Sequence, residues 1–275
     1  MPFLQAGYKR IHYTVYAPTE TRAGHETPTI VCHHGLGSSE NFYYPVVPAL
    51  VAAGFRVIVF DASGAARSPY TQIEQSIASL AADVLSILDA FSIAKAIVMG
   101  HSMGGIVASH LASDSASRGR IQAAVLIGPV YPNEAVSRAF EKRIEVVEKQ
   151  GMDAMADTIP FSAPGQGASP LVRAFIKELL LGQSSPGYLS HCRVICNAKP
   201  PKYEDIEAPL LIIAGEEDKS ADLGLCERMF QETGTKDKKM EVLKGVGHWH
   251  CLEAPDMVAE KILGFLKERG FGNLN

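Results

Sequence analysis

The sequence has no long hydrophobic run and no concentration of basic residues. None of its apolar segments approaches the roughly 18 consecutive residues that a membrane-spanning helix needs, so we expect no span. The net charge of −4 comes from 26 basic and 30 acidic residues, without a basic block. Nucleic acid is therefore not an expected partner, because its recognition needs a concentrated cationic face. The first residues also lack the charged and apolar regions of a secretory leader.

Cysteines are few and scattered. The five are Cys32, Cys192, Cys196, Cys226 and Cys251, an odd number without regular spacing. Disulfide frameworks are typical of short secreted chains with an even number of cysteines. We therefore expect free thiols, a reducing compartment and a cytoplasmic location.

What the chain does contain is an alternation of apolar, β-branched runs with helical patterns. The predicted strands are Thr29–Cys32, Arg56–Phe60, Ala96–Met99, Ala123–Ile127, Leu210–Ala214 and Lys239–Leu243, and the predicted helices are Pro45–Ala53, Gln72–Phe91 and Asp256–Lys267. Continuous apolarity indicates strands that are covered on both faces. We predict an α/β fold with a mostly parallel central sheet, helices on both faces, and Ile11–Tyr16 as an antiparallel edge. Thr71 and Glu74 have the spacing of a capping box for the second helix.

Residues 131–202 interrupt this alternation. They carry the helical patterns Ala135–Lys149, Pro170–Leu181 and Gly187–Asn197 and no clear strand. Open α/β sheets bind ligands at the carboxyl edge of their strands. We therefore predict a helical lid (cap) domain at 131–202 above that edge, on a core formed by 1–130 and 203–275.

Ser102 lies between glycines, in Gly100-His101-Ser102-Met103-Gly104. A predicted strand precedes this stretch and a predicted helix follows it, which is the context of a nucleophile elbow. The helix N-terminus beneath the serine favours developing negative charge. We predict that Ser102 is a catalytic nucleophile.

A serine hydroxyl needs a base to take its proton, and the base needs an acid to orient it. His248 follows the last predicted strand between small residues and is the preferred base, with His250 as the rival. Asp218 is the preferred acid because its loop has by then cleared the preceding strand, with Glu216 and Glu217 as alternatives. The order serine, acid, histidine is that of α/β-hydrolases.

An oxyanion hole must complete such a site. Met103 follows the nucleophile and supplies one backbone N–H, and Leu36, in the glycine-containing loop after the first parallel strand, is the candidate for the second. The adjacent His33 and His34 invite comparison with a metal site, but no carboxylate or cysteine nearby completes a ligand set. We expect no metal and no cofactor.

Together these motifs resemble the α/β-hydrolase superfamily across essentially the whole chain. The segments that carry the resemblance are His34–Ser38, Phe60–Ser68, Gly100–Gly105, Ala214–Asp218, Gly247–His248 and Glu253–Pro255. Two features depart from the family pattern. Ser63–Ala66 stands where Arg-Gly-x-Gly is usual, and His33 stands where an apolar residue is usual. Asp61 and Arg67 are expected to cap and tether their loop and are not assigned to chemistry.

Within the superfamily, the chain is similar to 3-oxoadipate enol-lactonases and related cofactor-free esterases. The similarity extends to the lid, at Arg143, Gly151–Ala156 and Pro186–Tyr188. It implies hydrolysis of a small-molecule ester or lactone through an acyl-enzyme, with the oxyanion bound by the Leu36 and Met103 N–H groups. Three alternative functions stay open, because proteins that have them resemble the same pattern: carbon–carbon bond hydrolases, cofactor-free haloperoxidases and slow-turnover small-molecule receptors. A homo-oligomer is compatible with the sequence.

Overall fold

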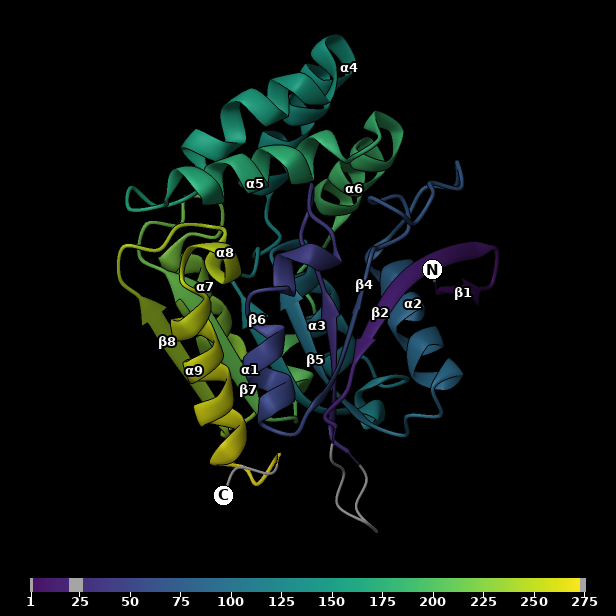
Figure 1. Ribbon diagram of the computed structural model, residues 1–275, viewed down its shortest axis with the longest axis vertical. Helices are drawn as coiled ribbons and strands as arrows, with labels where there is room; N and C mark the ends of the chain where they lie inside the picture. Colours follow the sequence, from purple (N-terminus) through teal and green to yellow (C-terminus); the bar gives the residue numbers. More distant parts are fainter. Residues whose placement is uncertain (1, 20–26, 273–275) are drawn as a thin grey trace.

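A computed structural model of the chain describes residues 2–19 and 27–272, so the predicted core boundaries at residues 1 and 275 lie outside it. Its centre is an eight-stranded sheet in the order β1-β2-β4-β3-β5-β6-β7-β8 (Figure 1). The strands are β1 (Phe3–Ala6), β2 (Lys9–Tyr16), β3 (Thr29–His33), β4 (Arg56–Phe60), β5 (Ala96–His101), β6 (Ile121–Ile127), β7 (Leu210–Gly215) and β8 (Lys238–Leu243). Strands β3 to β8 are parallel, and β2 pairs antiparallel with β4. The predicted parallel sheet with an antiparallel edge is confirmed, and β1 extends that edge as a hairpin with β2.

Helices cover both faces of the sheet. One face carries α1 (Val47–Ala52) and α9 (Pro255–Lys267), and the other carries α2 (Ile77–Ala90), α3 (Met103–Ser113) and α7 (Leu223–Glu232). The shorter elements are α8 (His250–Glu253) and the 3₁₀-helices η1 (Glu40–Tyr43), η2 (Arg118–Arg120) and η3 (Tyr203–Asp205). Buried apolar side chains line both faces, which explains why the central strands are apolar without alternation. Within the described ranges, every helix is too short or too polar to cross a membrane.

The predicted capping box at Thr71 and Glu74 is wrong. Helix α2 begins later, where Ser76 and Ser79 each accept a hydrogen bond from the other's backbone N–H at 3.1 and 2.9 Å. Glu74 instead forms an ion pair with Arg193 at 2.7 Å. The spacing pattern missed this because a partner more than a hundred residues away takes the Glu74 side chain.

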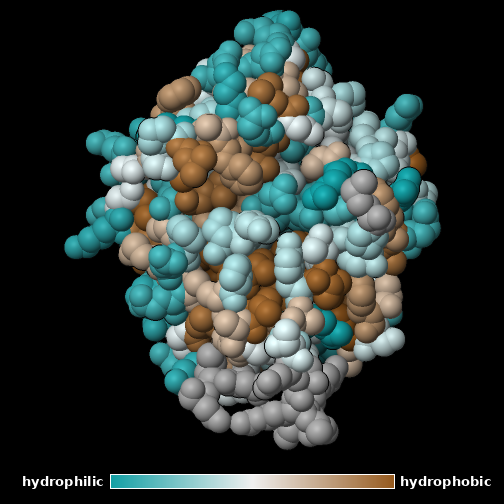
Figure 2. Space-filling model, viewed as in Figure 1, coloured by the Kyte–Doolittle hydropathy of each residue, from teal (hydrophilic) through white to brown (hydrophobic). Residues whose placement is uncertain are grey.

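A separate helical layer lies above the carboxyl ends of the parallel strands (Figure 1). It consists of α4 (Glu134–Ser162), α5 (Pro170–Leu181) and α6 (Ser185–Asn197). Helix α4 runs past its predicted end at Lys149 and is interrupted at Gly151, whose φ is 70°. Figure 2 shows hydrophobic side chains gathered over α5, and Phe161 and Leu171 are the most exposed large apolar residues of the layer.

The turn from β5 into α3 depends on residues without side chains. A Cβ atom on Gly100 would lie 2.0 Å from the Gly104 carbonyl oxygen, and one on Gly104 would lie 2.1 Å from the His33 carbonyl oxygen. Ser102, between the two glycines, has a φ of 55° and a ψ of −115°. A non-glycine residue reaches such a conformation only when its surroundings impose it. The turn therefore presents Ser102 at the carboxyl edge of the sheet.

Two alanine substitutions test this packing. Gly104→Ala should lower the free energy of unfolding by at least about 2 kcal/mol, because it overpacks α3 against β3. Gly264→Ala, in α9, has nothing within 4 Å of the added atom and should raise it by about 0.5–1 kcal/mol. Urea unfolding measures both, and an unchanged midpoint for Gly104→Ala would show that α3 is not held against β3 as described.

Candidate active site

Ser102, Asp218 and His248 lie in one hydrogen-bonded chain. Ser102 ends the turn after β5, Asp218 follows β7 and His248 follows β8, so all three lie at the carboxyl edge of the sheet. His248 Nε2 is 3.0 Å from Ser102 Oγ, and His248 Nδ1 is 2.8 Å from Asp218 Oδ2. The three residues are 5–8% exposed. Residues that are far apart in the sequence thus form one compact polar relay.

The three rival residues point elsewhere. Glu216 Oε2 accepts the Gly245 N–H at 2.9 Å, and Glu217 Oε2 accepts the Gln166 N–H at 2.7 Å. His250 is fully buried, and its Nδ1 lies 3.0 Å from the His248 carbonyl oxygen. None of the three takes part in the relay.

The surroundings of Asp218 determine the direction of each hydrogen bond in the chain from Asp218 to Ser102. Asp218 Oδ1 accepts the backbone N–H groups of Ser220 and Ala221, both at 2.8 Å. Burial alone would raise the pKa of Asp218, but the His248 imidazole and a backbone N–H outweigh it and hold the pKa below its ordinary value. The ionised carboxylate only accepts hydrogen bonds, so His248 Nδ1 carries a proton. The lone pair of His248 Nε2 then faces the Ser102 hydroxyl, which donates to it.

Two buried imidazoles hold the main chain of His248. His101 Nε2 donates to the His248 carbonyl oxygen at 2.8 Å, and His250 Nδ1 donates to the same oxygen at 3.0 Å. Burial lowers the pKa of His101 well below its ordinary value and that of His250 to about 4, so both rings are neutral at neutral pH. In the motif Gly-x-Ser-x-Gly, His101 stands at the first unspecified position, so the motif assigns it no role. A histidine at the end of an apolar strand was the one available signal for its role.

The two predicted oxyanion donors lie near Ser102, Met103 as the next residue of the chain and Leu36 beside it in the wall of a cavity. Met103 is the first residue of α3, and Leu36 lines a cavity together with Ser102 and His248. Within residues 2–19 and 27–272, neither the Leu36 N–H nor the Met103 N–H donates a hydrogen bond to another protein group. Two free N–H donors near the Ser102 hydroxyl have the chemistry that an oxyanion hole requires.

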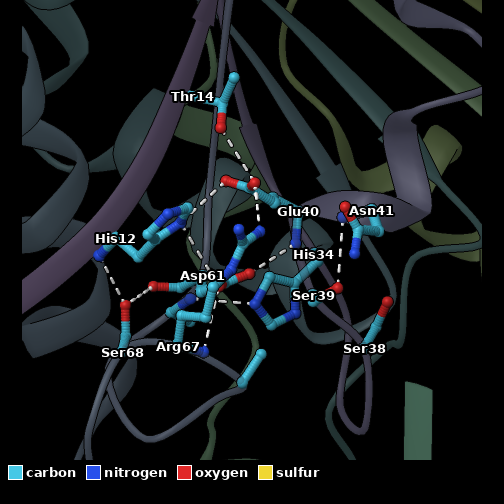
Figure 3. A network of polar contacts seen from close by, with 12 residues as sticks. His12, Thr14, His34, Ser38, Ser39, Glu40, Asn41, Asp61, Arg67 and Ser68 are labelled. Atoms are coloured by element: carbon cyan, nitrogen blue, oxygen red, sulfur yellow. Dashed lines mark hydrogen bonds and ion pairs between the residues drawn. The ribbon is translucent and has the colours of Figure 1, made fainter. Parts of the chain in front are cut away.

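A polar network fixes the loop that carries Leu36 (Figure 3). The Glu40 N–H donates to Asp61 Oδ1 at 2.8 Å, and the Ala62 N–H donates to His34 Nε2 at 2.9 Å. The Arg67 guanidinium bridges the carboxylates of Glu40 and Asp61. The loop after β3 is thereby tied to the loop after β4, and Asp61 and Arg67 cap and tether as expected.

The same network contains the group of described residues that has metal-ligand spacing. Ligand atoms of His12, Glu40 and Asp61 lie within 4.8 Å of one another. The Arg67 guanidinium already supplies the cation that these carboxylates require. His33 donates from Nδ1 to the His34 carbonyl oxygen at 2.9 Å, and burial lowers its pKa to about 3.

The cavity beside Ser102 has a volume of about 480 Å³. Helix α4 contributes Phe140, Arg143 and Ile159 to its wall, and the core contributes Leu36 and Trp249 among others. The lining mixes apolar side chains with polar and charged ones, among them Asn133, Lys219 and Asp222, and a cavity of this volume is typical of a small-molecule site. A larger hollow of about 780 Å³, near the start of α2, lies away from the relay and contains none of its residues.

Comparison with known proteins agrees with this architecture. A family model described as serine aminopeptidase, S33, matches residues 24–255. "Putative carbamate hydrolase RutD" of Variovorax paradoxus is 27% identical over 93% of this chain and 96% of its own length. "3-oxoadipate enol-lactonase 1" of Acinetobacter baylyi is 29% identical over 87% of this chain and 89% of its own.

Among solved structures, the enol-lactonase from Burkholderia xenovorans LB400 is 26% identical. It superposes with a TM-score of 0.86 over 97% of this chain and 100% of its own. The predicted fold class and the predicted resemblance are therefore confirmed. The chain is a hydrolase that belongs to the family described as serine aminopeptidase, S33, within the α/β-hydrolase superfamily.

Proposed function

We propose that the protein hydrolyses a small-molecule carboxylic ester or lactone through an acyl-enzyme on Ser102. The observation that carries this proposal is the hydrogen-bonded chain from Asp218 through His248 to Ser102. A lactone as the substrate is supported by the relative and the solved structure that are named enol-lactonases. Acyl transfer by such a relay needs no cofactor.

In the proposed reaction, the Ser102 oxygen attacks the carbonyl carbon while His248 Nε2 takes its proton. The oxyanion of the tetrahedral intermediate accepts hydrogen bonds from the Leu36 and Met103 N–H groups. His248 then gives the proton to the leaving oxygen, and the acyl group remains on Ser102. Water attacks the acyl-enzyme and loses a proton to His248, which returns that proton to the Ser102 oxygen as the acyl–oxygen bond breaks and the acid is released. Asp218 stabilises the imidazolium in both halves of the reaction.

We further propose that residues 131–202 act as a lid on a core formed by 1–130 and 203–275. The support is the shared cavity, because side chains of α4 form one wall and the relay residues lie in the other. A lid of this kind restricts the substrate by size and excludes water from the site.

A substrate panel tests the reaction class. Aryl esters, lactones, aryl carbamates and a vinylogous diketone all present a carbonyl carbon to a serine nucleophile. We expect the highest kcat/KM for an ester or a lactone. If a carbamate were the best substrate, the proposed substrate class would be wrong and the activity would match the name of the relative from Variovorax paradoxus. If the diketone were the best substrate, the result would contradict the proposal and indicate carbon–carbon bond hydrolysis.

Ser102→Ala should abolish turnover while the melting temperature stays close to that of the wild type, because the alanine removes only the nucleophilic oxygen. A fluorophosphonate should label the wild type once, and peptide mapping by mass spectrometry should place the label on Ser102. An active, folded alanine variant would remove Ser102 from the mechanism.

Asp218→Asn should lower kcat roughly 10³–10⁴-fold, because an amide no longer holds the imidazole in the required tautomer. Glu216→Gln alters a carboxylate of the same loop that bonds only to the Gly245 N–H, and its kcat should stay within about twofold of wild type. Steady-state kinetics on one aryl ester compares the two. The choice of acid would be wrong if the Glu216 variant showed the larger loss.

A further inference from the structure

One carboxylate, that of Glu253, holds three backbone N–H groups. Glu253 is the last residue of α8. Its Oε1 accepts the Trp249 N–H at 2.7 Å, and its Oε2 accepts the Gly247 N–H at 2.9 Å and the Gly165 N–H at 2.8 Å. Two of these N–H groups flank His248, and the third lies in the segment 163–166, which follows α4.

We propose that Glu253 is a positioning residue, which aligns His248 with Ser102 by tying the loop of the base to segment 163–166 of the helical layer. The inference rests on the proposed function. Glu253 does not itself line the cavity, although Trp249, whose N–H it accepts, does. It therefore acts on the site through the main chain of residues 247–249 and not by touching the reacting atoms.

The main chain around His248 has little freedom to move. The His248 N–H donates to the Ala163 carbonyl oxygen at 2.9 Å, so the three consecutive N–H groups of residues 247–249 are all bonded. The His248 carbonyl oxygen accepts from two imidazoles, as described above. Hydrogen bonds to a carboxylate are about twice as strong as neutral ones. Glu253 therefore supplies the strongest of these bonds and the one group that reaches both sides of His248.

The two segments touch along their backbones. A Cβ atom on Gly247 would lie 2.2 Å from the Gly165 nitrogen, and one on Gly165 would lie 2.4 Å from the Gly245 carbonyl oxygen. The loop that carries Asp218 also contacts segment 163–166, because Glu217 of that loop accepts the Gln166 N–H at 2.7 Å. Segment 163–166 thus rests on the base loop and on the acid loop at once.

The same segment adjoins the substrate cavity. Ile159, Ser162 and Ala163 line the cavity, and Ala163 also bonds His248. Loosening this contact shifts the imidazole relative to the Ser102 hydroxyl, and a displacement of about 1 Å at such a site costs about 10²-fold in rate. The loss should appear in kcat, since substrate is still bound by the remaining walls. A role in stability alone would leave kcat of the folded protein unchanged.

The first test changes the carboxylate. Glu253→Gln presents an NH₂ group to backbone N–H donors and loses at least one of the three bonds. At a temperature well below its melting transition, this variant should show a kcat about 10- to 100-fold below wild type, with KM within about threefold. Labelling of Ser102 by fluorophosphonate should slow by a similar factor. Glu216→Gln is the matched control, because Glu216 also accepts one backbone N–H but reaches neither flank of His248.

The second test acts from the helical layer. Gly165→Ala inserts a methyl group against the Gly245 carbonyl and should lower kcat in the same way, although it changes no residue of the base loop. Gly167→Ala is its control, because nothing lies within 4 Å of the added atom. In the double variant Glu253→Gln/Gly165→Ala, the fall in kcat should be smaller than the product of the single falls, since both break the same contact.

The outcomes separate the two proposals. A folded Glu253→Gln variant with wild-type kcat, or a Gly165→Ala variant that behaves like Gly167→Ala, overturns the positioning role while the wild type still hydrolyses the ester. Wild-type protein that neither turns over nor is labelled at Ser102 overturns the proposed function, and the inference that rests on it.

Discussion

The structure depends on a close approach of main chains that only glycine permits. Gly104 brings the start of α3 within contact of the end of β3, and Gly100 brings it against the end of β5. Ser102 is held between them at a φ of 55°, a conformation that costs about 1–3 kcal/mol and persists because the neighbouring strands pair on both sides of β5. One turn therefore delivers a hydroxyl, the first N–H of a helix and the helix dipole to the same point of the sheet edge.

The histidine must meet this fixed point from a loop, and loops are usually the mobile parts of a fold. Here hydrogen bonds from buried polar groups hold the loop in place, as backbone hydrogen bonds to neighbouring strands hold a β-strand. His101 and His250 donate to the carbonyl oxygen of His248, Ala163 accepts from its N–H, and Glu253 bonds the residues on either side. Within the described residues, His101 Nδ1 and His250 Nε2 are buried without a hydrogen-bond partner, a cost that the other bonds of the network offset. The loop of His248 is thus held by side chains of β5 and α8 and by the main chain of segment 163–166.

Patterns that are local in the sequence predicted the sheet and singled out Ser102 and His248 as candidates. Apolar runs located the parallel strands to within two residues, and the glycines around Ser102 and His248 marked the turns. Features that depend on distant partners were not predictable. Glu253 and Gly165 are separated by 88 positions, and no periodicity connects them. Glu74 has the spacing of a cap but pairs with Arg193 of α6. Helix α4 consists of two helical segments that meet at Gly151, whose non-helical φ of 70° ends the first segment close to its predicted end at Lys149.

The helical layer therefore meets the core in two different ways. The first half of α4 supplies Phe140 and Arg143 to the cavity and makes no hydrogen bond to the relay or to the residues that flank it. Segment 163–166 lies directly on the loops of His248 and Asp218. The first region contributes side chains to the cavity wall and does not hold His248 in place. Segment 163–166 bonds through its main chain to the His248 N–H and to the carboxylates of Glu253 and Glu217. Because Ala163 also lines the cavity, the turn after α4 connects the cavity wall to the loop of His248, whereas the first half of α4 lines the cavity without bonding to that loop.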